Sequence, residues 1–470
     1  GTVTQKIAHY IATELVPLAD IVLDYHSGGR TLDFLPFAAA HILPDKKQEA
    51  ACMAAMEAFN APYSMKMLEI DNRGMFDTEV EEQGKVFVTT ELGGAGTSTA
   101  KSIAVARKGA RNLLIGPAEP ATPAHHTGPF ASHYDAGRIT RGIDPDPDWA
   151  RLAQRSMARY GDIAAAGGVA FHYPVGAMLA GPDRSDGFIT RTATTAHASG
   201  IACRELRGAD LMQMGYSFPA GTAAVVEAGD AGFIDPRALV RAQITAATRA
   251  GLRHIPSAVR GIAQRDGHIH LTLEGGDGVI ARQVLLATGG YAALDGLLDV
   301  APPLTVYART IAMAHVSEAT AQRLRALPAL IWRPEPPGFY VYVVPPARYP
   351  DGSLRIKIGG DPVDRLLHGA EAANDWFRGG GAAEVAAQQI DILRGLLPDM
   401  EIAAISHGAC IISDTASGLP IIGRVAPGIS VLLGGNGAAA KSSDEIGRLG
   451  AVTLTGGSAD DEGYARKFAP

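Results

Sequence analysis

The chain contains 470 residues, of which 47% are hydrophobic and 19% are charged, and its formal net charge is −7 at pH 7. This length allows two or three domains around a large core, and the composition is typical of a globular enzyme rather than a disordered chain. The acidic balance, with no basic stripe, argues against nucleic acid as a partner.

The first 117 residues show an α/β pattern. Apolar periodicity predicts a helix over 3–14 and a short buried strand at 21–24. Alternating helical and strand-like runs end with a strand at 86–90, a helix at 97–108 and a strand at 112–116. Residues 118–129 are rich in proline and polar side chains, which predicts a linker.

The pattern of predicted helices and strands changes at residue 130. We predict a helix over 147–164, a strand over 223–229 and a helix over 236–251 that starts with proline. Strand-turn-strand patterns occupy 268–288 and 339–360, the second with Asp351 and Gly352 at its tip. This mixture of antiparallel and α/β elements predicts a cofactor domain interleaved with a substrate domain.

The cysteine content indicates a reducing compartment. Cys52, Cys203 and Cys410 are too few and too widely spaced for a disulfide framework or a zinc site, so we expect a cytoplasmic protein. No apolar run approaches membrane-spanning length, and the opening GTVTQKIAHY is not a signal peptide. Because it also lacks an initiator methionine, we expect the chain to begin at an internal point of a longer parent sequence. The oligomeric state cannot be predicted.

A glycine-rich turn near the C-terminus is the clearest functional signature. The run GGNGAAAKSSDEIGR at 434–448 leads from this turn straight into a predicted helix. Such an arrangement brings backbone N–H groups against a large anionic cofactor. Its usual companion is a strand followed by GxGxxG near the start of the fold, and that motif is missing in clean form.

Four segments carry a resemblance to a known family. They are SHYDAGRITR at 132–141, VLLATGGY at 284–291, RIKIGG at 355–360, and ACIISDTASGLPIIGR at 409–424 together with the GGNG turn. With them, the region from 129 to 470 resembles the D-amino-acid oxidase and sarcosine oxidase superfamily, whose members oxidise C–N bonds with FAD. The resemblance implies an amine or amino acid as substrate.

The resemblance also implies roles for individual residues. Arg141 would hold a substrate carboxylate, a task suited to a planar two-pronged donor. Lys357 would stabilise negative charge on reduced flavin or superoxide. The implied flavin-binding residues are Ser132, His133, Arg138, Gly289, Gly290, Gly434, Gly435, Asn436, Gly437 and Lys441, the last one turn into the C-terminal helix.

Each of these assignments has a structural alternative. Segment 132–141 could be a solvated basic turn, and Lys357 could be a surface-strand lysine. Cys410 falls where some relatives attach flavin covalently, but we favour the alternative of a small buried hydrophobe.

The expected fold class is therefore α/β plus α+β. We predict an α/β zinc-hydrolase fragment followed by an incomplete FAD-binding Rossmann-like domain interleaved with an antiparallel-sheet substrate domain. The cofactor parts are expected at about 130–175, 220–295 and 405–455. The substrate parts are expected at about 176–219 and 296–404.

The nucleotide-binding unit of such a fold should precede residue 132. The segment 86–116 has the order strand, glycine turn, helix, strand, but only Gly93 of the fingerprint positions 93, 95 and 98 is glycine. Glu91 would oppose the phosphates, and Glu119 is the only candidate to bind ribose. Either this segment substitutes for the missing unit, or its similarity is coincidental and it belongs to another fold.

Residues 1–117 resemble a second family, the zinc-dependent succinylglutamate desuccinylases and aspartoacylases. The motifs DYHSGG at 24–29 and TTELGG at 89–94 carry the likeness. It implies that His26 is one of three zinc ligands and that Glu91 activates water. No HxxE pair precedes His26 to supply the other ligands, so zinc is expected only if an upstream half is supplied.

Three functions remain open from the sequence. The first is an FAD-dependent oxidoreductase fused to a deacylase remnant. The second is a zinc deacylase whose upstream half lies outside this sequence, and the third is a rearranged chain without catalysis. The substrate and the electron acceptor are not determined.

Overall fold

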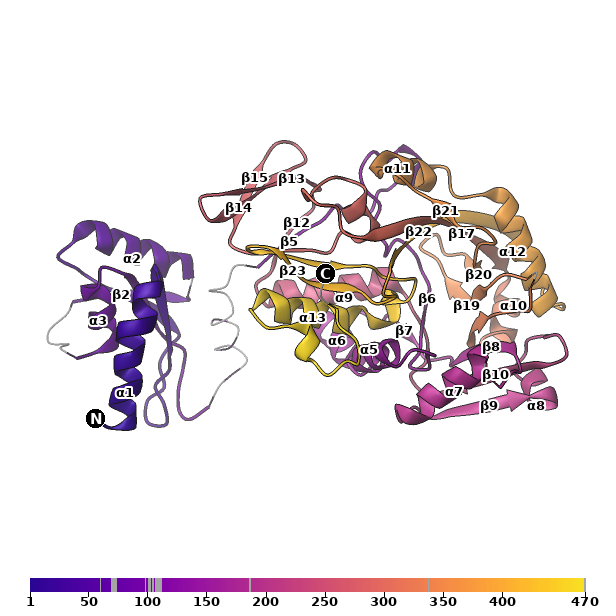
Figure 1. Cartoon of the computed structure of the whole chain (residues 1–470), viewed down its shortest axis with the longest axis horizontal. Helices are drawn as coiled ribbons and strands as arrows, with labels where there is room; N and C mark the ends of the chain where they lie inside the picture. Colours follow the sequence, from indigo (N-terminus) through magenta and orange to yellow (C-terminus); the bar gives the residue numbers. More distant parts are fainter. Residues whose placement is uncertain are drawn as a thin grey trace. The chain divides into compact units, whose positions relative to one another are not determined.

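The computed structural model describes residues 1–59, 61–68, 74–97, 99, 103, 105, 112–185, 187–336 and 338–468. The chain forms two compact units, which Figure 1 colours along the sequence. The smaller unit contains residues 1–114 and 246–254, and the larger unit contains 115–245 and 255–470. Among the described residues, no helix combines the length and apolarity needed to cross a membrane.

The smaller unit is built on a four-stranded sheet in the order β1-β4-β2-β3. The strands are β1 (Ile21–His26), β2 (Phe37–His41), β3 (Tyr63–Met67) and β4 (Val86–Glu91). Helix α1 (Val3–Tyr10) and the π-helical turn η1 (Ile11–Leu15) precede β1, in agreement with the predicted opening helix. Helix α2 (Lys46–Phe59) supplies Met53, Met56 and Phe59 to a core that it shares with β2 and β4, and α3 (Phe76–Glu82) precedes β4.

Strand β4 is a central strand of this sheet. It pairs in parallel with β1 on one edge and antiparallel with β2 on the other. Each edge of a strand forms one ladder of hydrogen bonds, so β4 has no edge left for another sheet. The strand that the sequence offered as a substitute for a nucleotide-binding unit is therefore part of the deacylase-like sheet.

The glycine turn after β4 is held by its own unit as well. The backbone N–H of Ala95 donates to Leu32 O at 2.8 Å, and that of Gly96 donates to Gly29 O at 2.7 Å. These two donors are thus engaged and do not face a phosphate. The third fingerprint position, 98, and most of the helix predicted at 97–108 lie outside the described residues.

The larger unit contains a nine-stranded sheet. Its order is β21-β17-β20-β19-β18-β8-β10-β9, and β22 also pairs with β17. These strands are β8 (Ala177–Pro182), β9 (Cys203–Arg207), β10 (Thr222–Glu227), β17 (Leu304–Val316), β18 (Ala329–Trp332), β19 (Val341–Arg348), β20 (Leu354–Gly359), β21 (Arg365–Leu366) and β22 (Ala404–Thr415). The sheet thus includes β10 and β22, which lie in sequence segments that we assigned to the cofactor domain.

Both faces of this sheet are covered by helices because alternate side chains point to opposite sides. On β8, Met178 packs in the cluster that contains Ile390 of helix α12 (Ala383–Leu396). The neighbouring Leu179 packs instead with Ile189 of helix α7 (Phe188–Ala198). The predicted hairpin at 339–360 is confirmed as β19 and β20, with Asp351 and Gly352 at the turn.

Shorter sheets and helices complete the larger unit. The strands β16 (Val284–Leu286), β24 (Ile429–Leu433) and β23 (Ile421–Ala426) form one sheet in that order. Helix α13 (Ser443–Leu454) contacts β23, β24 and α5 (Pro147–Met157), as Figure 1 shows near the C-terminus. The remaining strands are β6 (Arg138–Thr140), β7 (His172–Tyr173), β11 (Gly232–Ile234), β13 (Val259–Arg265), β14 (His268–Leu273), β15 (Gly278–Ala281), and the pair β5 (Leu113–Ile115) and β12 (Arg253–Ile255).

Two predicted helices differ in their limits. The helix expected over 147–164 is divided into α5 (Pro147–Met157) and α6 (Tyr160–Gly167). The break lies at 158–159, directly before Tyr160, whose buried ring packs on Phe171 and whose hydroxyl lies 2.9 Å from Thr140 Oγ1. The helix that starts with proline is α9 (Pro236–Arg249), two residues shorter than expected.

The predicted linker at 118–129 is docked on the larger unit. Arg378, at the end of α11 (Ala370–Arg378), donates a hydrogen bond to His126 O at 3.0 Å. Phe130 stacks on Phe377 with ring centroids 4.6 Å apart. These contacts attach the segment to α11.

The turn after β4 gives a test of the smaller unit. A Cβ at Gly94 would lie 1.9 Å from Leu32 O, whereas a Cβ at Gly84, where φ is +74°, would meet nothing within 4 Å. We expect Gly94→Ala to destabilise the smaller unit by about 3 kcal/mol and Gly84→Ala by about 1 kcal/mol, the cost of a left-handed alanine. Hydrogen exchange should accelerate in β1 and β4 of Gly94→Ala but not in β17 and β22. Equal protection of both variants would contradict the fixed turn.

Candidate functional site

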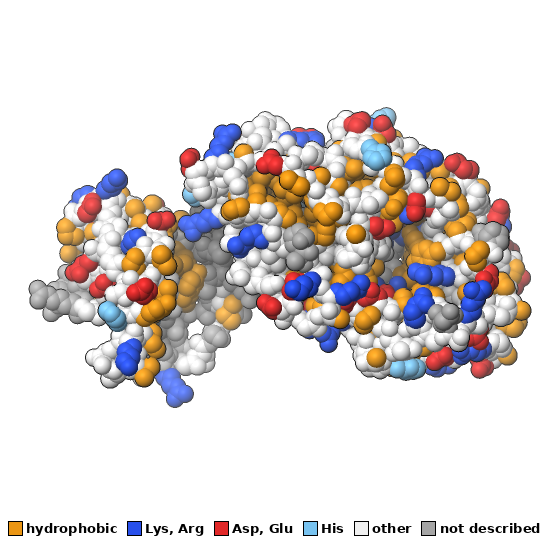
Figure 2. All heavy atoms as spheres, in the orientation of Figure 1, with side chains coloured by type: hydrophobic (Ala, Val, Ile, Leu, Met, Phe, Trp, Pro, Cys, Tyr) orange, Lys and Arg blue, Asp and Glu red, His pale blue; other side chains and the backbone are white. Residues whose placement is uncertain are grey.

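Two clusters of buried charges lie in the larger unit, and both start from the segment 132–141. Figure 2 shows Lys and Arg side chains around a hollow on one face of this unit, with hydrophobic side chains within it. Buried charges are costly unless they are paired, so each buried cation needs an identified partner.

The first cluster joins Lys357, Asp135 and Arg138. Lys357 projects from β20 with only 1% of its surface exposed, so it is not a surface-strand lysine. Its Nζ donates to Asp135 Oδ2 at 2.6 Å and also to the carbonyl oxygen of Gly137. Arg138 donates to the same carboxylate oxygen through Nη1. The ammonium is therefore fixed in position by the turn that precedes β6.

The pairing changes the pKa values of both partners. Burial lowers the pKa of Lys357 to about 8, although the neighbouring Asp135 opposes this change. Burial alone would raise the pKa of Asp135, but Lys357 and Arg138 together lower it to about 2. The carboxylate is thus ionised at neutral pH, and it holds two cations at one oxygen.

Aromatic and sulfur groups surround this cluster. The ring of Tyr342 on β19 has its centroid 5.4 Å from Lys357 Nζ, within the range of a cation–π contact. Cys410 on β22 accepts a long hydrogen bond from Arg138 Nη2 to its Sγ at 3.7 Å. Cys410 is half-buried and forms no disulfide. It thus lies beside Arg138 rather than in an apolar core.

The second cluster joins Arg141, Lys441 and Asp144. Arg141 Nη1 donates to Asp144 Oδ2 at 2.7 Å and to Ile143 O at 2.6 Å. Lys441 Nζ donates to the same Asp144 Oδ2 at 2.8 Å. All three residues are buried. Burial and the nearby Arg141 together lower the pKa of Lys441 to about 8, although Asp144 opposes this change.

The structure brings together residues that the sequence had assigned separately. Arg138 joins Lys357, and Arg141 joins Lys441, whereas Ser132 is exposed and the half-buried His133 packs edge-on against Tyr134. Sequence reasoning missed Asp135 and Asp144. The signal was available, because each aspartate lies three residues from its arginine in SHYDAGRITRGID.

The glycine turn at 434–437 differs from the prediction in its connection to the helix. A 3-10 turn, η5 (Ala439–Ser442), comes first, so α13 begins at Ser443 and Lys441 lies before the α-helix rather than one turn into it. Asn436 adopts φ +47°, where its Oδ1 accepts from Thr415 N at 2.9 Å. Gly434 and Gly437 also have positive φ.

The glycine pair at 289–290 lies just after a strand. β16 ends at Leu286, and Gly289 and Gly290 begin the 3-10 turn η4 (Gly289–Ala293). A Cβ at Gly290 would lie 3.1 Å from Val306, whereas one at Gly289 would meet nothing within 4 Å. Gly289 thus leaves open space at the end of the strand.

Glu119, the candidate ribose ligand, has a protein partner. Its carboxylate accepts from Arg237 Nε at 2.8 and 2.9 Å and from Nη2 at 2.6 Å. This two-pronged pair at the start of α9 occupies both carboxylate oxygens. Glu119 therefore serves a structural ion pair in this structure.

The deacylase-type residues lie together at the ends of β1 and β4. His26 and Glu91 are register partners, and His26 Nδ1 lies 2.6 Å from Asp24 Oδ2. This contact raises the pKa of His26, and burial raises the pKa of Glu91, whose Oε2 is buried without a partner. Within the part of the chain that the structure describes, no group of three His, Cys, Asp or Glu could hold a metal ion.

Comparison with known proteins identifies the class of both parts. The chain belongs to the FAD dependent oxidoreductase family, whose sequence model matches residues 92–452. The model of the succinylglutamate desuccinylase/aspartoacylase catalytic domain matches residues 1–116. The two matches overlap at 92–116, and the turn in this overlap hydrogen-bonds to residues 28–34 of the smaller unit.

Individual relatives agree with this division. The N-alpha-acetyl-L-2,4-diaminobutyric acid deacetylase of Halomonas elongata is 54% identical over 115 residues, which are 24% of this chain and 34% of that protein. The chain thus spans about a third of the length of this curated relative.

Solved structures of two oxidases resemble the larger part of the chain. A variant of NikD, an unusual amino acid oxidase essential for nikkomycin biosynthesis, has a TM-score of 0.60 at 19% identity and covers 78% of this chain and 94% of its own. Amadoriase I, the fructosyl amine:oxygen oxidoreductase of Aspergillus fumigatus, has a TM-score of 0.56 at 17% identity. The match covers 76% of this chain and 83% of amadoriase I. At these identities the likeness shows a shared fold.

The lowered pKa of Asp135 gives a test by acid unfolding. Its pKa falls from 3.8 to about 2 on folding, so its contribution to stability is present above pH 3.8 and is lost as the pH falls toward 2. This contribution is about 2 kcal/mol. We expect the free energy of unfolding to fall less steeply between pH 4 and pH 2 in Asp135→Asn than in the wild type, measured by urea titration. The exposed Asp391→Asn should keep the wild-type slope, and an unchanged slope in Asp135→Asn would refute the pairing.

Proposed function

We propose that the larger unit oxidises the C–N bond of an amine or amino acid with FAD. Membership of the FAD dependent oxidoreductase family carries this proposal. The two oxidases that share its fold are named for an amino acid and for a fructosyl amine, both of which contain an amine nitrogen.

The residues of the larger unit fit the ring end of a flavin. Four buried polar atoms of this unit have no protein partner within the described ranges, namely Arg141 Nε, Ser442 Oγ, Gln389 Oε1 and Asp414 Oδ1. Buried polar atoms are normally paired, so unpaired ones are expected where a ligand supplies the partner. The positive φ of Gly437, with no atom within 4 Å of an added Cβ, leaves space beside the turn. Arg138, Lys357 and the turn at 434–437 would hold the ring.

The chain's own residues provide orientation and electrostatics. When bound, FAD accepts the hydride of the substrate carbon. Lys357 keeps its ammonium in one place because Asp135 and Gly137 O fix it, so it can stabilise negative charge without reorganisation. Arg138 adds a second fixed cation beside it.

Among the residues that the structure describes, we identify no binding unit for the dinucleotide end of FAD. β4 and its glycine turn belong to the smaller unit's own sheet, and Glu119 is paired with Arg237. We therefore propose that the adenine half of FAD contributes little to binding. FAD and FMN should then bind with dissociation constants within about tenfold, a difference of about 1.4 kcal/mol.

Flavin titration of the purified full chain, followed by absorbance and fluorescence, measures both affinities. A preference for FAD of more than about a hundredfold, roughly 2.7 kcal/mol, would show that the nucleotide end is held. A protein that binds neither flavin at saturating concentration would refute the oxidoreductase and favour a chain without catalysis. Colour that stays with the acid-precipitated protein would assign covalent attachment to Cys410.

Substitution of Lys357 separates binding from turnover. We expect Lys357→Met to retain flavin and to lower the rate of flavin reoxidation by about a hundredfold, because a fixed cation is lost where charge develops. The matched control is Lys467→Met, which removes an exposed lysine of the same unit and should keep the wild-type rate. Equal rates for both variants would remove Lys357 from the mechanism.

The residues of the smaller unit do not fit a catalytic zinc site. Such sites need three protein ligands, and among the described residues His26 belongs to no group of three possible ligands. We expect the full chain to hold no stoichiometric zinc by elemental analysis, and His26→Ala and Glu91→Gln to leave flavin binding unchanged. Stoichiometric zinc with amidase activity would instead favour the deacylase as the working enzyme.

A further inference from the structure

Arg333 lies immediately after strand β18, and two aromatic rings place its guanidinium group. The central carbon of that group is 4.2 Å from the centroid of the Phe188 ring and 5.2 Å from that of the Tyr340 ring. Both distances are in the range of a cation–π contact, which orients an arginine and leaves its N–H groups free. Because residue 333 is exposed, these N–H groups are open to a ligand.

This arginine has no acidic partner among the residues that the structure describes. Glu335, two residues further along the same loop, is paired with Arg184 instead, with Arg184 Nη2 at 2.5 Å from Glu335 Oε1. Arg333 is therefore an oriented cation without a counter-charge within the described ranges. A planar fork of free N–H donors in one fixed place suits the binding of a carboxylate.

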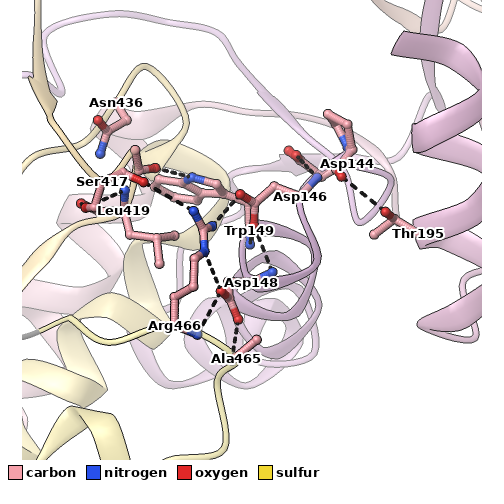
Figure 3. Close-up of polar contacts among 12 residues, drawn as sticks. Asp144, Asp146, Asp148, Trp149, Thr195, Ser417, Leu419, Asn436, Ala465 and Arg466 are labelled. Atoms are coloured by element: carbon pink, nitrogen blue, oxygen red, sulfur yellow. Dashed lines mark hydrogen bonds and ion pairs between the residues drawn. The ribbon is translucent and has the colours of Figure 1, made fainter. Parts of the chain in front are cut away.

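Helix α7 connects Arg333 to the loop that carries Arg141. Phe188 is the first residue of α7, and Thr195 lies about two turns further along. Thr195 Oγ1 donates to Pro145 O at 3.1 Å, as Figure 3 shows. The ring that supports Arg333 and the loop after Arg141 are thus held by the same helix.

Tyr340 connects Arg333 to the ring end of the candidate flavin site. Tyr342 lies two residues further along and contacts the Lys357 ammonium. Alternate residues of an extended segment point to the same side, about 7 Å apart. Burial of the hydroxyl raises the pKa of Tyr340, and the charges of Arg141 and Arg333 oppose this change. Because 42% of Tyr340 is nevertheless exposed, the row of side chains that starts at Lys357 ends in solvent.

Two arginines therefore flank the hydroxyl of Tyr340, one buried and one exposed. The resemblance to the oxidase family assigns the buried one, Arg141, to a substrate carboxylate, and its Nε has no partner within the described ranges. We propose that Arg333 binds a second carboxylate of the substrate, which is then an N-substituted amino acid with two acidic groups. This inference rests on the proposed function and names its substrate class.

The binding test needs neither flavin nor turnover. The probes are ¹³C-labelled malonate, succinate and glutarate, which differ in the spacing of their carboxylates, and acetate is the reference with one carboxylate. NMR line broadening reports their binding to the full-length protein. We expect the best dicarboxylate to bind the wild type about tenfold or more tightly than acetate, because its second contact is intramolecular. In Arg333→Gln this advantage should fall to about twofold, the statistical gain from two equivalent carboxylates.

The control variant is Arg325→Gln. It removes another exposed arginine of the larger unit that forms no ion pair within the described ranges, so it should behave as the wild type. A wild type without an advantage for any dicarboxylate would overturn the proposal, and so would an equal advantage in the wild type and Arg333→Gln.

Two substrate pairs give a second measurement. N-methylaspartate and N-methylasparagine differ only in the charge of the distal group, as do N-methylglutamate and N-methylglutamine. For at least one pair, we expect the flavin-loaded wild type to have a kcat/KM about tenfold higher for the acid, through a lower KM at similar kcat, and Arg333→Gln to lose this preference. Equal kcat/KM within both pairs would overturn the proposal. Oxidation of no amine at all would count against the proposed function, while the dicarboxylate titration would still decide the role of Arg333.

Discussion

A β-strand has two edges that can pair, and this limit determines which sheet β4 can belong to. β4 uses both edges within the deacylase-like sheet, and the turn that follows it donates its N–H groups to residues 29 and 32. The larger unit therefore keeps the fold of a flavin oxidase without taking a first nucleotide-binding strand from this segment. The segments that resemble the two families meet here, and β4 can pair in the sheet of only one of them.

Within the larger unit, the two clusters of buried ion pairs share one design. Each cluster places two cations on one aspartate oxygen. One aspartate, Asp135, lies in the loop before β6, and the other, Asp144, lies in the loop after it. Removing one partner would leave an uncompensated charge, so these side chains form fixed units rather than mobile ones. A fixed cation is useful where negative charge develops.

Much of the fold followed from local sequence, but the site followed only in part. The hairpin around Asp351 and Gly352 and the strand at 86–90 were predictable because turn residues and apolar runs act locally. The arginines and Lys357 were recognisable from their motifs. The roles of Asp135 and Asp144 were not, because a pair such as Asp144 and Lys441 joins positions about 300 residues apart. The pairing of β4 also required the structure, since either sheet was compatible with its sequence.

The last residues of the chain take part in the support of the site. Arg466 fastens the start of α5, Ala465 N donates to Asp148 at 2.7 Å, and the buried Phe468 accepts from Ile422 N at 2.7 Å. The helix that positions Asp144 is thereby tied to the C-terminal segment. Loss of these contacts would release the start of α5, on which the position of Asp144 depends.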